Sequence, residues 1–435
     1  MGHDNYSIIS LFTGGMGLDL GLEQAGFRTR VAIEINEAAI KTVKTNKPDL
    51  PIICFPIQTV STKEILKKAG LSRGEATLVT GGPCCQSFST AGKRGSVCDP
   101  RGILFEDYCR VISEAKPRFF IMENVKGLLS AAIKHRPLNE RGHGSPPLAP
   151  QEELGSAFKV ILSELRSLGY YVIYGLLNAA DYGTPQNRQR IVIIGSRDGE
   201  KIALPKTTHS RDGKNGKQKW ATLKEAIAPI KSREWSEFSD KQLFYLKLLG
   251  PGQNWTALPE NIQPKALGGA YYSWGGRSGF YRRLSWDKPS PSLTTQPKGK
   301  ATMLCHPSED RPLSVEEYAR IQGFPYNFVF SGNINDKYTL IGNAVPLRLG
   351  LAIGKMLMTT IKDTDKNGLP KDAVKKLSQI ICADPLLKNR LRKQPKTQLP
   401  PSRFRSNPDP EAAKRWLSRS RRSLKLDHVT RICLP

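Results

Sequence analysis

The sequence predicts an α/β protein with a doubly wound, mostly parallel sheet and a second, smaller domain. Three observations lead to this fold class. Short apolar runs alternate with helix-like segments over residues 6–197. That periodicity fades between about 198 and 281, where Gly, Lys, Trp and Tyr become more frequent. Strand and helix patterns then return between about 282 and 360.

Taken in order, the first 197 residues supply most of the predicted sheet. The predicted strands are 7–12, 30–33, 51–55, 77–80, 118–122, 170–177 and 191–195. The predicted helices are 18–25, 37–45, 62–69, 104–115 and 154–168. Strands that alternate with helices in this way favour βαβ crossovers and parallel pairing. Residues 138–151 are rich in Pro, Gly and charge and are expected to form a surface loop.

The rest of the chain divides into three parts. Residues 198–281 are predicted to form the small domain, with a polar loop at 209–219. Residues 282–360 return to the first domain, with a strand at 292–295 and helices at 315–321 and 347–361. Residues 361–435 form a basic extension with 19 Lys and Arg against 7 Asp and Glu, and 410–425 has the pattern of a basic helix.

Composition indicates a globular protein with a polyanionic partner. The chain has 435 residues, 39% hydrophobic residues and a mean hydropathy of −0.40, which suits two or three domains. A net charge of +27 favours nucleic acid over a merely basic surface, because cations release the counterions of phosphates. We expect no membrane segment and no secretory signal. The eight Cys lack the spacing of a disulfide framework, and without CxxC or HxxxH no metal site is expected.

Polar clusters stand at the ends of three predicted strands. Pro83-Cys84-Cys85-Gln86 follows the strand at 77–80 and a Gly-Gly break. Glu123 and Asn124 end the strand at 118–122, and the segment 186–190 precedes the strand at 191–195. The carboxyl ends of strands in an open α/β sheet are where ligands bind. A thiolate there can attack an electrophile, although the Cys segment taken alone fits a core or surface Cys equally well.

Six segments together resemble the ordered motifs of the DNA (cytosine-5) methyltransferases that use S-adenosylmethionine. In chain order they are the Gly-rich turn Phe12–Gly17, Glu34, the Pro-Cys-Cys-Gln turn, Glu123-Asn124-Val125, Gln186-x-Arg188-x-Arg190 and Gly342-Asn343-Ala344-Val345-Pro346. The resemblance covers about 6–197 and 283–360. It implies a Rossmann-like, class I methyltransferase domain, with 198–281 as the target-recognition domain.

The resemblance implies that Cys85 is the nucleophile that adds to C6 of cytosine, since C5 is otherwise a poor nucleophile. Glu123 would be the acid at N3, and burial would favour its protonated form. Arg190 and Arg188 would support Glu123 or the base. Alternatives remain: Cys84 could exchange roles with Cys85, Glu123 could cap a helix, and the two Arg could contact phosphate only.

The expected cofactor is S-adenosyl-L-methionine, held by a glycine turn after the first strand and an acid after the second. The residues expected to bind it are Phe12, Gly14, Gly15, Gly17, Glu34, Ile35, Ile57, Pro83, Leu104, Asn343 and Val345. The sequence departs from the family at two places. Met16 stands at the usual second Gly of the turn, and Pro56 replaces an Asp that would hold the adenine amine.

The expected substrate is double-stranded DNA, from which the target base must be flipped out. The residues expected to contact DNA are Gln86, Ser89, Lys93, Arg94, Arg101, Arg277, Arg282 and Arg283. The segment 89–102 resembles the family's mobile loop, with a passive loop as the alternative. Trp274 and Tyr281 are expected in the core of the small domain, and the basic tail is expected to bind phosphate without specificity.

The sequence thus predicts a sequence-specific DNA cytosine-5 methyltransferase, a monomer in the cytoplasm of a bacterium or encoded by a phage. A restriction–modification setting is expected, with a cognate restriction endonuclease as a further partner. Two rival hypotheses stay open: a tRNA cytosine-5 methyltransferase of the same fold, and a DNA-binding homologue without catalysis.

Overall fold

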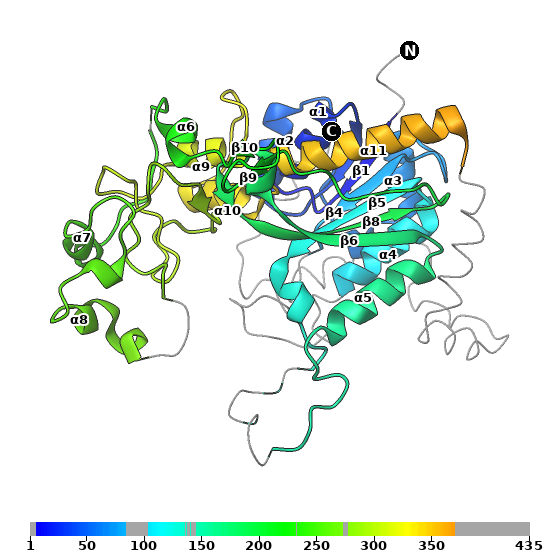
Figure 1. The fold of residues 1–435 in the computed structure, drawn as a ribbon. Helices are drawn as coiled ribbons and strands as arrows, with labels where there is room; N and C mark the ends of the chain where they lie inside the picture. The colour runs from blue at the N-terminus through cyan, green and yellow to red at the C-terminus, as the bar shows by residue number, and fades with distance from the viewer. Residues whose placement is uncertain are drawn as a thin grey trace, which may run out of the picture.

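A computed structural model describes residues 6–83, 103–134, 136, 140, 145–231, 233–272 and 277–369. Its centre is a seven-stranded sheet with the order β3-β2-β1-β4-β5-β8-β6 (Figure 1). The strands are β1 (Ser7–Leu11), β2 (Arg28–Ile33), β3 (Ile52–Ile53), β4 (Leu78–Gly81), β5 (Phe119–Val125), β6 (Tyr171–Asn178) and β8 (Gln189–Ser196). The predicted α/β class is confirmed.

The sheet is parallel except at β8. β1 pairs in parallel with β2 and β4, and the parallel pairs β2–β3 and β4–β5 extend the sheet on both sides. β8 runs antiparallel to both β5 and β6. Because β8 is reversed, its first residues lie beside the carboxyl end of β5, and Arg190 is registered with Val125. This reversal brings the predicted segment 186–190 to the edge of the sheet that carries Glu123.

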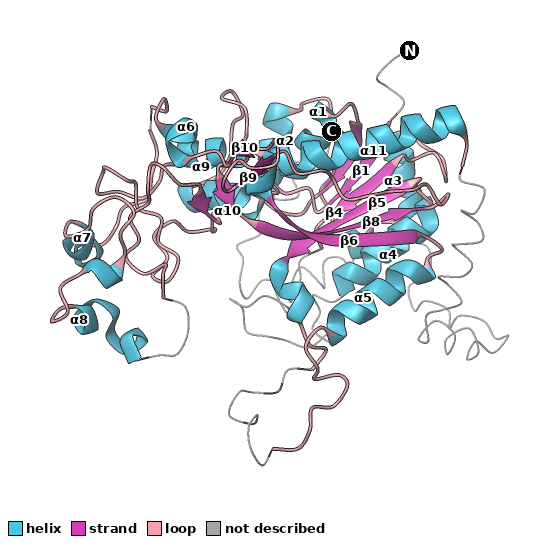
Figure 2. Cartoon of the chain, viewed as in Figure 1, coloured by secondary structure: helices cyan, strands magenta, loops and turns pink. Residues whose placement is uncertain are grey.

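Helices cover both faces of the sheet (Figure 2). One face packs against α3 (Thr62–Ala69), α4 (Ile103–Ala115) and α5 (Ser156–Ser167), and the other against α1 (Gly17–Gln24) and α11 (Leu347–Asn367). Helix starts follow ordinary capping chemistry. The side chain of Asn36 caps α2 (Glu37–Asn46), and that of Ser61 caps α3.

α1 and α11 cross closely because glycines line their contact. A Cβ on Gly21 would lie 2.4 Å from the main-chain oxygen of Leu347, and one on Gly350 would lie 2.9 Å from that of Leu18. The crossing places the start of α11 directly beside the Gly-rich turn that precedes α1. The segment 334–367 is, among the described residues, long and apolar enough to span a bilayer. Pro346 separates its two helices, however, and 56% of its most apolar window is buried within the protein.

A further cluster of core residues joins α9 (Val315–Gln322), with its Ser314 capping box, and α10 (Ile334–Asn343) to α6 (Leu223–Ile227). The helix α10 was not predicted. The strand predicted at 292–295 is wrong. The extended pairing begins two residues earlier, where β11 (Ser290–Pro291) pairs with β7 (Gln186–Asn187). The segment 209–219, expected as a loop, contains the short pair β9 (His209–Ser210) and β10 (Gln218–Lys219).

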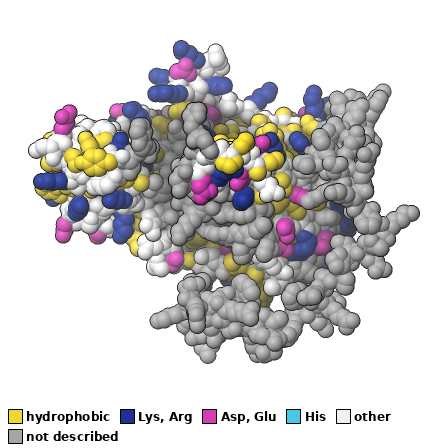
Figure 3. Space-filling model, turned by 90° about the horizontal axis from the view of Figure 1, so that it is seen from below, with side chains coloured by type: hydrophobic (Ala, Val, Ile, Leu, Met, Phe, Trp, Pro, Cys, Tyr) yellow, Lys and Arg dark blue, Asp and Glu magenta, His cyan; other side chains and the backbone are white. Residues whose placement is uncertain are grey.

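A small separate core lies beside the sheet domain, around α7 (Asp240–Leu246) and α8 (Gln263–Leu267). It gathers Phe238, Leu249 and Tyr281, together with Met303 and Cys305 from the predicted return segment. Tyr281 is therefore a core residue, as expected. Figure 3 shows Lys and Arg side chains spread over this part of the surface, around a group of hydrophobic side chains.

Candidate active site

A buried ion pair occupies the carboxyl edge of the sheet between β5 and β8. Nε of Arg190 lies 2.8 Å from Oε1 of Glu123, and each side chain is only 13% exposed. Burial raises the pKa of the Glu123 carboxyl, and the charges of Arg190 and Arg188 partly oppose that rise in pKa. The site therefore holds a carboxyl that takes up a proton more readily than an exposed Glu does.

The end of β4 meets this pair. A Cβ on Gly82 would stand 3.2 Å from Oε2 of Glu123, a tight contact that Gly avoids, so the strand end lies close to the carboxyl. The Nδ2 of Asn124, next to Glu123, donates to the carbonyl of Pro83 at 3.1 Å. Asn124 thereby fixes the main chain at the residue that opens the Pro-Cys-Cys-Gln turn.

The turn itself falls outside the described residues. This applies to the predicted nucleophile Cys85 and its neighbour Cys84. It applies equally to the predicted DNA-contacting residues Gln86, Ser89, Lys93, Arg94 and Arg101, and to Trp274. What the structure gives of this segment is its start, the buried Pro83 held by Asn124.

Arg188 is tied to main-chain oxygens. Its side chain is 1% exposed, and it donates to the carbonyls of Leu293 at 2.8 Å and Gly342 at 2.7 Å, and to Oγ of Ser292 at 3.3 Å. Burial lowers the pKa of this guanidinium. The contacts link β7 and β8 to the segment after β11 and to the end of α10. Arg188 therefore holds the walls of the site, whereas Arg190 faces Glu123.

A buried amide pair performs a similar task beneath the site. Nε2 of Gln186 donates to Oε1 of Gln322 at 2.7 Å, and Oε1 of Gln186 accepts from the N–H of Leu293 at 2.9 Å. Nε2 of Gln322 in turn donates to the carbonyls of Ile341 and Ala344. Every polar end of this pair is used, which fixes the segment that carries Asn343 and Val345.

The Gly-rich turn after β1 is strained where the sequence departs from the family. Met16 caps α1 with a φ of 62°, and Phe12 and Gly14 also have positive φ values of 57° and 54°. A left-handed conformation costs a non-Gly residue roughly 1–2 kcal/mol. The Met16 side chain is fully buried, so its packing offsets that strain and the turn keeps its shape without the usual Gly.

Glu34 closes the turn from the second strand. Its Oε2 accepts from the N–H of Gly14 at 2.7 Å, and its Oε1 accepts from the N–H groups of Ile35 and Asn36 at 2.8 and 2.9 Å. A carboxylate offers about four acceptor positions, so one remains for a donor such as a ribose hydroxyl. Beside it, Ile35 and Phe55 are 58% and 56% exposed, which leaves an apolar surface for a flat ring.

The other predicted cofactor residues lie around the same turn. A Cβ on Gly15 would be 3.2 Å from the Leu340 oxygen, and one on Gly17 only 2.2 Å from the Val345 oxygen. Leu104 packs against the core below, and Ile57 begins a 3₁₀ turn, Ile57–Thr59, directly after Pro56. The first N–H of such a turn has no partner within it, and the N–H of Ile57 has no acceptor among the residues that the structure describes. This cradle fits an adenosyl cofactor.

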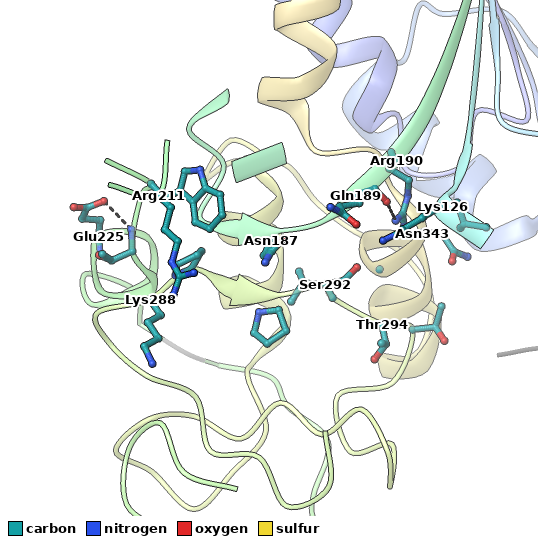
Figure 4. A pocket seen from close by; sticks show the side chains of 18 of the residues that line it. Lys126, Asn187, Gln189, Arg190, Arg211, Glu225, Lys288, Ser292, Thr294 and Asn343 are labelled. Atoms are coloured by element: carbon teal, nitrogen blue, oxygen red, sulfur yellow. Dashed lines mark hydrogen bonds between the residues drawn. The ribbon is translucent and has the colours of Figure 1, made fainter. Parts of the chain in front are cut away.

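A cavity of about 1200 Å³ opens between the sheet edge and the segment after β10 (Figure 4). Arg190, Lys126 and Asn343 lie at one end, Arg211 and Lys288 at the other, and Asn187 and Ser292 between them. Its lining contains five cations and two acids, Glu225 and Asp287. Lys126, Arg211, Lys219 and Lys288 were not predicted as site residues. Only the Lys-rich, Gly-rich composition of 209–219 could have drawn attention to two of them.

The arginines predicted to read bases have internal partners. Arg283 is 5% exposed and donates to the carbonyls of His306, Glu309 and Leu246, and it pairs with Asp310. Such a guanidinium has little left to offer a base, so we assign Arg283 to the fold. Arg277 donates to the carbonyls of Ala270 and Tyr271, and it stacks 5.0 Å from the Trp255 ring.

Arg282 is the remaining predicted reader within the described residues. It donates from Nε to the carbonyl of Met303 at 3.1 Å, and burial lowers its pKa. Within the described part of the chain, no group of three or more His, Cys, Asp or Glu is placed to hold a metal ion.

A sheet of this strand order, with a Gly-rich turn after β1 and an acid after β2, defines a Rossmann-like enzyme built to bind a nucleotide-type cofactor at the carboxyl edge. The model of the C-5 cytosine-specific DNA methylases matches residues 6–359, and the chain belongs to this family. The predicted family and enzyme class are confirmed.

Curated relatives cover most of the chain. The type II methyltransferase M.Sau96I of Staphylococcus aureus is 37% identical over 81% of this chain and 76% of its own length. M.Eco47II of Escherichia coli is 33% identical over 83% and 81%. Among solved structures, DNMT2 of Spodoptera frugiperda has a TM-score of 0.53 at 16% identity, covering 82% of this chain and 99% of its own. The methyltransferase EhMeth of Entamoeba histolytica has a TM-score of 0.52 at 16% identity, with coverages of 83% and 99%. These two share the fold.

Proposed function

We propose that the protein methylates C5 of a cytosine within a specific sequence of double-stranded DNA, with S-adenosyl-L-methionine as the methyl donor. The observation that carries the proposal is the buried Glu123–Arg190 pair. It lies beside Pro83, two residues before Cys85 in the sequence. The similarity to type II methyltransferases supports a restriction–modification setting, with a cognate endonuclease that acts on the same site.

The residues around the Gly-rich turn would hold the cofactor. Glu34 would accept from the ribose, and Ile35 and Ile57 would bound the adenine. Val345 and Asn343 would close the methionine end. When bound, the cofactor supplies an electrophilic methyl group. Because Pro56 has no side-chain acceptor, the N–H of Ile57 is the group that we expect to meet the adenine ring.

Each reacting group on the protein then has one task. The Cys85 thiolate adds to C6, which makes C5 nucleophilic. Glu123, whose carboxyl is buried, would donate a proton to N3 as charge develops on the ring. Arg190 would orient Glu123, and its charge opposes part of the rise in the pKa of that carboxyl. After C5 has received the methyl group, a water molecule would take up the C5 proton, the thiolate would leave C6, and N3 would return its proton to Glu123, which restores the ring.

The base must leave the duplex to reach this pair, at a cost of about a few kcal/mol. The cavity beside Arg190 would give it a route, since five cations that can meet the phosphates of DNA line that cavity. Arg188 would act by holding the cavity walls in place rather than by touching the base.

The test uses the purified full-length protein and a labelled methyl donor with three substrates: genomic DNA, tRNA and DNA lacking cytosine. We expect label in genomic DNA only, with bisulfite sequencing placing it at C5 of one cytosine in a recurrent sequence. Label in tRNA alone would contradict the proposal in favour of an RNA methyltransferase. Absence of label together with absence of cofactor binding by calorimetry would indicate a DNA-binding homologue without catalysis.

A further inference from the structure

A basic segment beside the cavity has no role in the chemistry derived above. The residues are 209–219, which we call the basic ribbon. It carries Arg211, Lys214, Lys217 and Lys219 and a single acid, Asp212. Arg211 and Lys219 line the cavity, and both are exposed. Lys214 lies 3.7 Å from Asp212, whereas Arg211 and Lys219 form no ion pair with any residue that the structure describes.

The basic ribbon is seated on the catalytic domain. The N–H of Thr208 donates to the carbonyl of Asp181 at 3.0 Å, and Nε1 of Trp220 donates to Oδ1 of the same residue at 2.8 Å. Asp181 lies in the 3₁₀ helix Ala179–Tyr182, which directly follows β6. The residues on either side of the basic ribbon, Thr208 and Trp220, thus both donate to Asp181 at the edge of the main sheet.

A glycine allows the basic ribbon to approach this closely. A Cβ on Gly183 would lie 2.7 Å from a ring carbon of His209 and 2.7 Å from a guanidinium nitrogen of Arg348. Gly183 also has a φ of 82°, which other residues adopt only with strain. The basic ribbon is therefore attached to the domain that carries Arg190 and Glu123, and not to the small core around α7 and α8.

Two further cations, Lys126 and Lys288, lie in the lining of the cavity outside the basic ribbon. Lys288 lies at the same end as Arg211, and Lys126 lies at the other end beside Arg190 (Figure 4). Lys126 and Lys288 are exposed, and neither forms an ion pair within the described residues. Of the two acids, Glu225 is occupied in a capping box, where it accepts from the N–H of Thr222 at 3.0 Å.

We infer that the basic ribbon binds the sugar–phosphate backbone of duplex DNA and positions the duplex over the Glu123–Arg190 pair without reading its sequence. This inference rests on the proposed function. Long flexible cations contact phosphates without selecting bases, and a contact anchored to the catalytic domain serves every sequence equally. The recognition of bases would then lie elsewhere in the chain.

The test compares the full-length wild type with R211Q/K219Q and with the matched control K67Q/K68Q, which removes two exposed cations from α3 on a helix that does not line the cavity. Fluorescence anisotropy gives the Kd for a random-sequence duplex and for an equally long duplex that contains the methylated sequence, from 50 to 200 mM salt. Binding of S-adenosyl-L-homocysteine by calorimetry checks that each variant is folded.

Each lost phosphate contact lowers the slope of log Kd against log salt by about 0.9. We therefore expect R211Q/K219Q to lose about 2 from the slope on both duplexes. Between 50 and 200 mM salt, the Kd of the variant would rise by a factor about 12 times smaller than the factor for the wild type. The ratio of the Kd values for the two duplexes would be the same in the variant as in the wild type. The control should keep the wild-type slope.

An unchanged slope in R211Q/K219Q would overturn the inference, as would a weakening confined to the methylated sequence, since that result would mean base reading. A wild type that transfers no methyl group to DNA, with the slope reduced in the variant, would refute the proposed function and leave the phosphate surface intact. A wild type that methylates DNA with an unchanged variant slope would refute the inference alone.

Discussion

Asp19 is a buried carboxyl beneath the Gly-rich turn, and its replacement by Asn should change how stability depends on pH. The side chain is 2% exposed and accepts from Oγ of Ser10 at 2.9 Å and from Oγ1 of Thr80 at 3.2 Å. Burial raises the pKa of Asp19 from its ordinary value of 3.8 to about 7, against the opposing effect of the Ser10 hydrogen bond.

The direction and the size of the change in the free energy of unfolding follow from the number of protons that Asp19 binds in the folded and the unfolded state. Between pH about 4 and 7 the unfolded chain has lost the Asp19 proton while the folded protein keeps it, so stability falls as pH rises through this window. A shift of about 3 pKa units at about 1.4 kcal/mol each amounts to about 4 kcal/mol, present at pH 4 and lost by pH 8. The amide of the Asp19→Asn variant cannot ionise, so the variant loses none of this stability.

The assay is urea unfolding of the wild type and Asp19→Asn at pH 4, 5, 6, 7 and 8, with Asp49→Asn as a control for the loss of one exposed carboxyl. Groups common to both proteins cancel in the difference. The free energy of unfolding of the Asp19→Asn variant, relative to wild type, should rise by about 4 kcal/mol between pH 4 and 8. A difference that stays constant over this range would refute the reasoning.

Three further substitutions test the site. Gly17→Ala places a Cβ 2.2 Å from a main-chain oxygen, so binding of S-adenosyl-L-homocysteine by calorimetry should weaken at least tenfold, whereas Gly269→Ala, with open space around it, should bind normally. Arg190→Gln leaves the Glu123 carboxyl without its ion pair and raises its pKa, so methylation should fall by about 10²-fold or more, with the alkaline limb of the pH–rate profile, where Glu123 loses its proton, moved to higher pH; an unchanged profile would contradict the pairing. Asn124→Ala removes one hydrogen bond that positions the turn, worth about 1 kcal/mol, so kcat should fall about fivefold with KM for DNA unchanged, and a change in KM alone would argue against that role.

The sheet could be predicted because its signal is local. Runs such as Ile191–Ile194 are buried on both faces and therefore uniformly apolar, and Asn, Ser and Thr mark the helix starts. Strand direction was harder, since the reversal of β8 depends on pairing with residues far away in the sequence. The helix α10 was missed because its apolar positions serve a core shared with α6 and α9.

Part of the site could be predicted because it consists of charged residues at the ends of apolar strands. Glu123 and Arg190 stand at strand ends and do meet. The roles of Arg188 and Arg283 could not be derived, because an Arg that donates to main-chain oxygens looks the same in sequence as one that faces DNA. The cations of the cavity could not be predicted either, because Lys126 and Lys288 are far apart in the sequence and only the fold brings them to one cavity.

The central claim is that Cys85 bonds to the cytosine ring beside Glu123. A duplex with 5-fluorocytosine at the methylated position tests it, because the C5 fluorine cannot leave as the C5 proton does and the adduct persists. With cofactor present, the wild type and Cys84→Ala should form a complex stable to denaturing gel electrophoresis, and Cys85→Ala should form none. Trapping by Cys85→Ala that is lost in Cys84→Ala would contradict the account.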